Sequence, residues 1–248
     1  MAAYDFAGPR LFVDGPLAPG GRLVLDRGQA NYLLNVLRLK PGDPVLVFNG
    51  RDGEWRAHVA PEGRKAAALE IAERTREQTV PADLLLLFAP LKHARLDYLV
   101  QKAVEMGVSA LRPVFTRRTQ ASRVNLERMR ANVIEAAEQC GILALPEILP
   151  EEDFSAAIAA LEPDRLVVFC DEEAPVANPL DALRAHGDPP ARLAVVIGPE
   201  GGFTDEERAT LGRRRAVLRL SLGPRILRAD TAAVAALAVV QAGIGDWR

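Results

Sequence analysis

The sequence predicts an α/β protein in which a short β-rich part precedes a larger part with a parallel sheet. The first 75 or so residues contain short apolar or alternating segments separated by turn residues, which is typical of strands. From about residue 80 onward, apolar segments alternate with helical patterns, which is typical of a parallel sheet covered on both faces. The 248 residues, 49% of them hydrophobic and 26% charged, are enough to bury a sizeable core.

The β-rich part is expected to hold four strands and one helix. The strands are predicted at residues 10–13, 22–25, 44–48 and 54–59, and the helix at about residues 29–37. Pro-Gly, Asn-Gly and Asp-Gly pairs mark the turns between them. A small β-barrel is the natural way to close such a set of strands. Because the pattern changes just before residue 80, we expect two domains, residues 1–76 and 77–248.

The larger part is expected to contain five strands and five helices in alternation. The strands are predicted near residues 84–88, 111–115, 166–170, 193–197 and 217–221. The helices are predicted near residues 95–106, 126–139, 154–161, 205–214 and 231–242. The last helix is rich in Ala and Val on all sides, so we expect it to be buried.

Composition excludes several classes of protein. The 31 Lys and Arg against 33 Asp and Glu give a net charge of −2, so any nucleic-acid site must be a local patch. Two cysteines imply no disulfide framework, and three scattered His residues predict no metal site. No apolar run has the length of a membrane span, and the first ten residues do not resemble a signal peptide. We therefore expect a cytoplasmic protein with neither membrane nor metal partners.

Two Gly-rich segments follow predicted strands and are the strongest candidates for a binding site. In VVIGPEGGFTDEE (residues 195–207), a buried strand enters a Gly/Pro loop, and Thr204 with Glu207 can form a capping box for the next helix. In LRLSLGPRILRADT (residues 218–231), a second strand leads through Gly-Pro to two arginines and a helix. Loops at the carboxyl ends of parallel strands are where such sheets bind ligands. Plain strand–helix turns remain the alternative, since neither nucleotide-binding fingerprint is present.

One segment of the larger part is strongly basic. Residues 112–130 contain six arginines and a single acidic residue, Glu127. Such a cluster can bind the phosphates of a nucleic acid. It can also be an ordinary solvated surface, and both interpretations stay open at this point.

Four of these segments together resemble the motifs of one family. They are LDYLVQKAVEMGV (96–108), EQCG (138–141), IGPEGGFTDEE (197–207) and LGPRILRADTA (222–232). They are similar to the motifs of the bacterial small-subunit ribosomal RNA uridine-N3 methyltransferases of the SPOUT superfamily. NYLLNVLRLKPGD (31–43) resembles the small PUA-like barrel of that family, so the resemblance covers nearly the whole chain.

The resemblance implies a fold and an activity. The fold is an α/β protein whose C-terminal parallel sheet with a deep trefoil knot follows a small PUA-like β-barrel. The implied activity is transfer of a methyl group from S-adenosylmethionine (SAM), bound in the knot, to N3 of one uridine of 16S rRNA. The implied partners are the assembled 30S ribosomal subunit and a second copy of the chain.

The resemblance also implies that three loops hold the cofactor. Apolar side chains there can sandwich the adenine, and backbone groups can read its edge. The expected cofactor-binding residues are Phe169, Cys170, Ile197, Gly198, Pro199, Glu200, Gly202, Leu220, Ser221, Leu222, Gly223, Ile226, Leu227, Arg228 and Thr231.

The chemistry requires a stabilising cation and a proton acceptor. Loss of the N3 proton spreads negative charge onto O2 and O4 of the uracil, which a positioned arginine can stabilise. Arg228 is the first candidate and Arg10 the second, and Glu138 or Glu200 can take the proton. The expected RNA contacts are Arg10, Arg38, Lys40, Lys92, Lys102, Arg117, Arg118 and Arg123.

The sequence departs from the family pattern at three positions. The family usually has His at the position of Asn31 and Arg at the position of Ile142. At the position of Asp230 it more commonly has Glu. Two alternatives share the fold: a methyltransferase acting on a ribose 2′-oxygen or guanosine N1 of RNA, and a non-catalytic RNA-binding assembly factor. A test of SAM binding distinguishes the non-catalytic assembly factor from an enzyme. A small-molecule enzyme is disfavoured because no nucleophile–base pair or metal-ligand cluster is evident.

Overall fold

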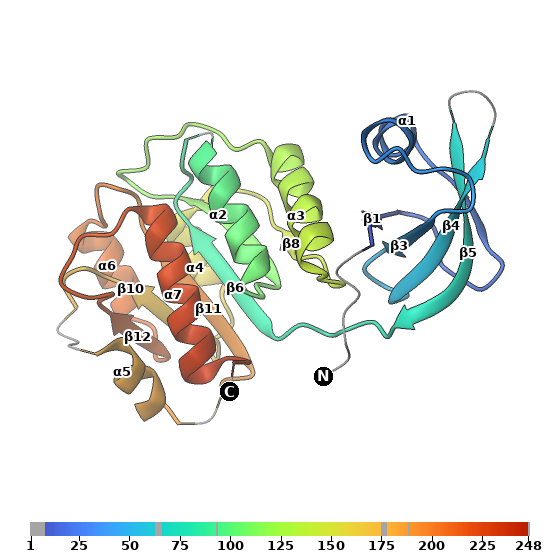
Figure 1. Cartoon of the computed structure of the whole chain (residues 1–248). Coiled ribbons are helices and arrows are strands. Elements are labelled where there is room, and N and C mark those ends of the chain that lie inside the picture. The colour runs from blue at the N-terminus through green and yellow to red at the C-terminus, as the bar shows by residue number, and fades with distance from the viewer. Residues whose placement is uncertain (1–7, 63–65, 93, 175–177, 188, 248) are drawn as a thin grey trace. The chain divides into compact units, whose positions relative to one another are not determined.

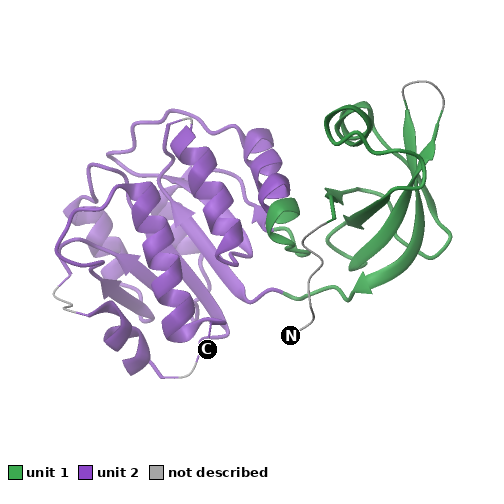
Figure 2. Ribbon diagram, in the orientation of Figure 1, with its two compact units in different colours: residues 1–80, 137–145 green, residues 81–136, 146–248 purple. Residues whose placement is uncertain are grey.

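The chain forms two compact units (Figure 2). The computed structural model describes residues 8–62, 66–92, 94–174, 178–187 and 189–247. Unit 1 comprises residues 1–80 and 137–145, and unit 2 comprises residues 81–136 and 146–248. Residues 137–145 were not predicted to belong with the N-terminal part, because periodicity does not reveal what the last turn of a helix packs against.

Unit 1 is a curled sheet of five strands in the order β1-β3-β4-β5-β2 (Figure 1). Strand β1 pairs in parallel with β3, and the other neighbours are antiparallel. Buried side chains such as Leu33, Val47 and Leu69 form its core. The strands are β1 (Arg10–Phe12), β2 (Arg22–Val24), β3 (Pro44–Phe48), β4 (Glu54–Pro61) and β5 (Ala67–Arg76).

Strand β5 and the helical segment of unit 1 differ in detail from the sequence prediction. β5 was not predicted, because its second half carries Glu73, Arg74 and Arg76 and so lacks a clear apolar alternation. The helix near residues 29–37 begins earlier, as α1 (Arg27–Asn31), with an Asp26 capping box, and continues as one π-helical segment, η1 (Tyr32–Val36). The segment ends near Arg38, whose φ of 57° is unusual for a residue with a side chain.

Unit 2 contains the predicted parallel sheet, in the order β12-β10-β11-β6-β7-β8. Each neighbouring pair is parallel, which confirms the predicted sheet type. A two-residue strand, β9 (Glu152–Asp153), pairs separately with β7. The deep trefoil knot remains a prediction of the resemblance. The main strands are β6 (Asp83–Phe88), β7 (Ala110–Phe115), β8 (Glu147–Ile148), β10 (Leu166–Cys170), β11 (Arg192–Ile197) and β12 (Val217–Leu220).

Helices cover both faces of this sheet (Figure 1). Helices α4 and α6 pack together over one face, where Phe154, Phe169 and Phe203 belong to one buried cluster. Helix α7 packs on β11 with α2 and α5 beside it. The helices are α2 (Ala94–Glu105), α3 (Leu126–Cys140), α4 (Phe154–Ala160), α5 (Pro179–Ala185), α6 (Asp205–Gly212) and α7 (Ala229–Ile244).

Helix α7 is buried on one side only, contrary to the prediction that it is buried all round. Ala233, Leu237 and Val240 face the core, whereas Ala235 and Val239 are only half-buried. The residues on both sides of this helix are apolar. Composition alone therefore does not distinguish a fully buried helix from a half-buried helix whose outer side is also apolar.

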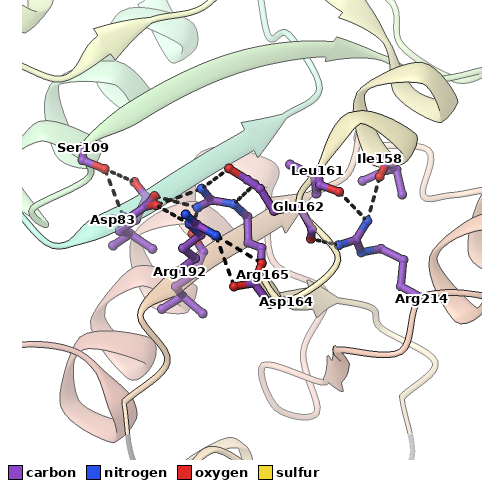
Figure 3. A network of polar contacts seen from close by, with 11 residues as sticks. Asp83, Ser109, Ile158, Leu161, Glu162, Asp164, Arg165, Arg192 and Arg214 are labelled. Atoms are coloured by element: carbon purple, nitrogen blue, oxygen red, sulfur yellow. Dashed lines mark hydrogen bonds and ion pairs between the residues drawn. The ribbon is translucent and has the colours of Figure 1, made fainter.

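A network of ion pairs joins the amino-terminal ends of the central strands (Figure 3). Arg165, just before β10, is buried and lies 2.6 Å from Asp83 and 2.8 Å from Glu162. Arg192, at the start of β11, lies 3.1 Å from Asp164 and 3.8 Å from Asp83. These contacts fix the starts of β6, β10 and β11 next to one another, at the end opposite to the loops considered below.

Candidate functional site

A cavity of about 260 Å³ lies in unit 2 at the carboxyl ends of three neighbouring strands, β10, β11 and β12. This is the position at which parallel sheets bind ligands. Its walls are formed by Cys170, Asp171, Glu172, Ile197, Gly198, Pro199, Glu200, Gly201, Gly202, Phe203, Leu220, Ser221, Leu222, Gly223, Arg225, Ile226, Leu227, Ala229 and Ala232.

Most of the residues predicted to bind cofactor line this one cavity. Three do not. Phe169 is buried beneath the loop, and its ring centroid lies 4.9 Å from that of Phe203. Arg228 is the N-cap residue of α7 and is exposed, and Thr231 lies in the first turn of that helix. The predicted residues that line it are Cys170, Ile197, Gly198, Pro199, Glu200, Gly202, Leu220, Ser221, Leu222, Gly223, Ile226 and Leu227.

The loop between β11 and α6 has its shape because of its glycines. A Cβ on Gly198 would lie 2.4 Å from the ring of Phe203, so only glycine lets that ring pack beneath the loop. Gly202 has a φ of +69°, and its N–H donates to the carbonyl of Pro199 at 2.9 Å, which closes a turn. The predicted capping box of Thr204 and Glu207 is confirmed and starts α6 directly after the turn.

A buried carboxylate anchors the opposite wall of the cavity. Asp171 follows β10, and its N–H donates to Leu220 C=O at 2.9 Å, which joins the ends of β10 and β12. Its side chain is fully buried and pairs with Arg208 at 3.4 Å and with Arg219, whose Nε lies 3.1 Å away. The two guanidinium groups balance the buried charge, so the role of Asp171 in this structure is to hold the wall.

The adjacent thiol is not activated. Burial, and then the charge of Asp171, raise the pKa of the Cys170 thiol to about 12. The thiol therefore stays protonated at neutral pH, and Cys170 contributes an uncharged surface to the cavity instead of a nucleophile.

The four candidate catalytic residues fall in different surroundings. Glu200 lies in the cavity wall and pairs with Arg95 of α2. The guanidinium of Arg228 has no partner among the described residues, and the side chain is exposed. Arg10 and Glu138 both belong to unit 1: Arg10 is buried against Glu54, and Glu138 accepts a hydrogen bond from the N–H of Phe12 at 2.8 Å.

The arginines of residues 112–130 divide into two groups. Arg112 pairs with Glu152, Arg128 pairs with Asp97, and Arg118 donates to the carbonyl of Gly201. The side chains of Arg117, Arg123 and Arg130 are exposed and have no partner in the described part of the chain. The basic segment is therefore partly structural and partly a free cationic surface.

The remaining predicted RNA contacts are all on the surface, apart from Arg10 and Lys102. Arg38 and Lys40 are exposed on the segment after η1 in unit 1, and Lys92 is exposed before α2 in unit 2. Lys102 is half-buried and lies 2.6 Å from Glu105, so its charge is already balanced.

Several residues of the site were absent from the predicted set. Glu172, Phe203, Ala229 and Ala232 line the cavity just outside the three segments predicted to hold the cofactor, residues 169–171, 197–202 and 220–227, so extending each segment by a few residues would have found them. Arg95 and Arg118, which contact the Gly-rich loop from α2 and from the end of β7, could not be found this way. Those contacts bridge more than eighty residues of sequence, and no local pattern marks them.

Comparison with known proteins identifies the class of this protein as an RNA methyltransferase. A family model described as RNA methyltransferase domain matches residues 78–241, and one described as RNA methyltransferase PUA domain matches residues 25–72. The Rickettsia conorii ribosomal RNA small subunit methyltransferase E is 31% identical over 94% of this chain and 94% of its own length. The chain therefore belongs to the ribosomal RNA small subunit methyltransferase E family.

Two solved structures are similar over almost their whole length. The ribosomal RNA small subunit methyltransferase E from Neisseria gonorrhoeae, bound to SAM, is 27% identical with a TM-score of 0.86, covering 97% of this chain and 100% of its own. A methyltransferase from Legionella pneumophila, in complex with SAM, is 29% identical with a TM-score of 0.81, covering 95% and 97%. In the described part of this chain, no helix has the length and apolarity to cross a membrane.

Proposed function

We propose that this chain transfers the methyl group of SAM to N3 of one uridine of 16S rRNA in the small ribosomal subunit. Family membership makes it an SAM-dependent ribosomal RNA methyltransferase. The observation that carries the site assignment is the single cavity formed by both Gly-rich segments at the ends of β10, β11 and β12. A ribosomal RNA substrate supports a cytoplasmic location for the protein.

The residues of the cavity fit SAM. Ile197, Leu220, Leu222 and Leu227 provide apolar surface for an adenine ring. Glycine at position 202 leaves room for the carboxylate of Glu172 beside the cavity, since a Cβ there would lie 2.8 Å from it. The carboxylates of Glu172 and Glu200 also line the cavity, where they pair with Arg208 and Arg95. When bound, SAM supplies an electrophilic methyl group.

Arg228 stabilises the charge that develops on the target base. It lies at the start of α7, directly after the loop that lines the cavity, and its guanidinium has no partner in the described residues. An arginine stays protonated, so it can donate hydrogen bonds to uracil oxygens but cannot accept the N3 proton. Holding N3 in line with the methyl group supplies a further part of the rate enhancement.

A carboxylate accepts the N3 proton, either directly or through water. Of the two candidates, Glu200 lines the cavity and Glu138 belongs to unit 1. The ion pair with Arg95 orients the carboxylate of Glu200. We favour Glu200 because a base must come within hydrogen-bond distance of the proton that it takes.

The exposed cations bind the RNA backbone. Arg117 and Arg123 of unit 2 and Arg38 and Lys40 of unit 1 have no ion-pair partner in the described residues. Unpaired surface cations of this kind bind phosphate with release of counterions. The left-handed conformation of Arg38 supports a functional role, because such backbone strain gathers at binding sites.

A second copy of the chain covers the outer side of α7. Ala235, Ala238 and Val239 form a half-buried apolar stripe on that side. A homodimer would remove this surface from water, which supports the dimer that the family resemblance implies. Sedimentation equilibrium should give twice the chain mass, and Val239→Glu should give the monomer. A monomeric wild-type protein would contradict the dimer.

The activity is tested with labelled SAM and purified small subunits from cells that lack this enzyme. Incorporation of about one methyl group per small subunit, with none into large subunits, is the expected result. Free 16S rRNA is the comparison substrate. Weaker methyl transfer to free RNA than to the small subunit would support recognition of the assembled subunit. Binding of SAM without transfer to any ribosomal RNA would contradict the proposed function.

A further inference from the structure

Two adjacent arginines lie in the turn that follows β7, and their surroundings differ. The Thr119 N–H donates to Thr116 C=O at 3.2 Å, and Thr119 Oγ1 accepts from the Thr116 N–H at 2.9 Å. Thr116 is buried, whereas the residues between the two threonines, Arg117 and Arg118, are exposed. The turn therefore has a fixed backbone and presents two cationic side chains.

The turn is tied to the start of α6 through a buried carboxylate. The Arg117 N–H donates to Glu207 Oε1 at 2.8 Å. The other oxygen of Glu207 accepts from the Thr204 N–H at 2.7 Å and from the Thr204 hydroxyl at 3.0 Å. Because Glu207 completes the capping box of α6, the turn is held next to the end of the Gly-rich loop.

Arg118 contacts that loop directly. Its Nη1 donates to Gly201 C=O at 2.7 Å. Its aliphatic stem covers Gly201, since a Cβ on that glycine would lie 3.4 Å from Cβ and Cδ of Arg118. Gly201 is part of the cavity wall, so this arginine determines where the wall lies. Among the described residues, the guanidinium of Arg117 has no hydrogen-bond or ion-pair partner.

We propose that Arg118 is a positioning residue that holds the cofactor loop, whereas Arg117 of the same turn binds RNA phosphate. The inference rests on the proposed function and assigns the two arginines to different substrates. A charge-assisted hydrogen bond to a carbonyl is among the stronger ones, and its loss leaves residues 199–202 without their outer support. Residues 116–119 thus connect the RNA-binding surface with the cofactor cavity.

The test compares Arg117→Ala, Arg118→Ala and Arg118→Lys in the full-length protein. Calorimetric titration with SAM should show an affinity loss of about three- to tenfold for Arg118→Ala and none for Arg117→Ala. Arg118→Lys should recover part of the affinity, because it keeps a charged donor at this position. In steady-state assays, Arg118→Ala should raise KM for SAM more than KM for the small subunit.

Salt dependence of RNA binding supplies the second readout. Arg117→Ala should reduce the slope of log K against log salt by about 0.7–0.9, whereas Arg118→Ala should leave it unchanged. Unchanged SAM affinity in Arg118→Ala, or a slope reduced as in Arg117→Ala, would overturn the inference. An equal affinity loss in both Arg118 variants would also overturn it. Failure of the wild-type protein to bind SAM would instead overturn the proposed function.

Discussion

The guanidinium of Arg10 lies 2.8 Å from the carboxylate of Glu54, and both side chains are almost completely buried within unit 1. Arg76 also reaches Glu54, at 3.4 Å, and donates to Gly141 C=O at 2.9 Å. The buried carboxylate of Glu54 therefore lies at the point where β1, β4, β5 and the segment after α3 meet. Arg10 was a candidate for catalysis and for RNA contact, whereas in this structure its guanidinium is already paired with Glu54.

Replacing Arg10 should act first on folding. Arg10→Ala leaves Glu54 buried with Arg76, at 3.4 Å, as its remaining cation and the Thr75 hydroxyl as a neutral donor, so the free energy of unfolding should fall by about 3 kcal/mol. Urea denaturation followed by circular dichroism measures this. The double variant Arg10→Met with Glu54→Gln should recover much of the loss, because it removes both charges. Wild-type stability of Arg10→Ala together with a large loss of kcat would support the catalytic role instead.

Replacing Arg228 should act on turnover alone. Its side chain is exposed and has no partner in the described residues, so Arg228→Ala should keep the melting temperature and the SAM affinity of the wild type. Loss of one charge-stabilising donor should lower kcat by about 10²–10³-fold. Arg215→Ala, an exposed arginine away from the cavity, is the control. A parallel loss of SAM affinity would make Arg228 a cofactor-binding residue.

A methyl group on Gly202 should damage the cavity. Gly202→Ala forces a side chain into a φ of +69° and brings Cβ to 2.8 Å from Glu172 Oε1. The backbone cost is about 1–2 kcal/mol, so the loop should shift and the KM for SAM should rise. Gly212→Ala is the matched control, because a Cβ there meets nothing within 4 Å. It should leave KM unchanged, and equal KM values for both variants would refute the assigned role of this loop.

The ion pairs at the other end of the sheet should make stability depend on pH (Figure 3). Hydrogen bonding from Arg165 lowers the pKa of Glu162 from 4.5 to about 2. A carboxyl whose pKa is lowered by folding stabilises the protein above its unfolded pKa and loses that contribution as the pH falls from 4.5 toward 2. Stability should therefore decline across this window.

The variant Glu162→Gln should lose less stability over that acid range than the wild type. Urea unfolding at about pH 7 and about pH 3 compares the two proteins. Glu135→Gln, an exposed residue of α3, is the control and should follow the wild type. A Glu162→Gln protein that loses as much stability as the wild type would show that this pair does not contribute.

Local patterns predicted the parallel sheet and the loops of the cavity, because both are encoded in short segments. β11 reads as a continuous apolar run, and Gly198 to Gly202 together with Thr204 and Glu207 mark the turn and the helix that follow it. The contacts of Arg95, Arg118 and Arg165 were not predicted, because each depends on residues far away in the sequence. The burial of the outer side of α7 was predicted wrongly for a different reason. An apolar helix surface has the same sequence pattern whether the unit itself or a partner covers it.

Nucleoside analysis of small-subunit RNA treated with this enzyme and SAM, combined with reverse transcription, tests methylation at uridine N3 itself. N3 carries the pairing proton of uridine, so methylation there blocks pairing and stops the copy. We expect 3-methyluridine as the only new nucleoside and one new stop in 16S rRNA, both strongly reduced with Arg228→Ala at equal enzyme concentration and reaction time. A ribose-methylated nucleoside or 1-methylguanosine, or no new nucleoside, would contradict it.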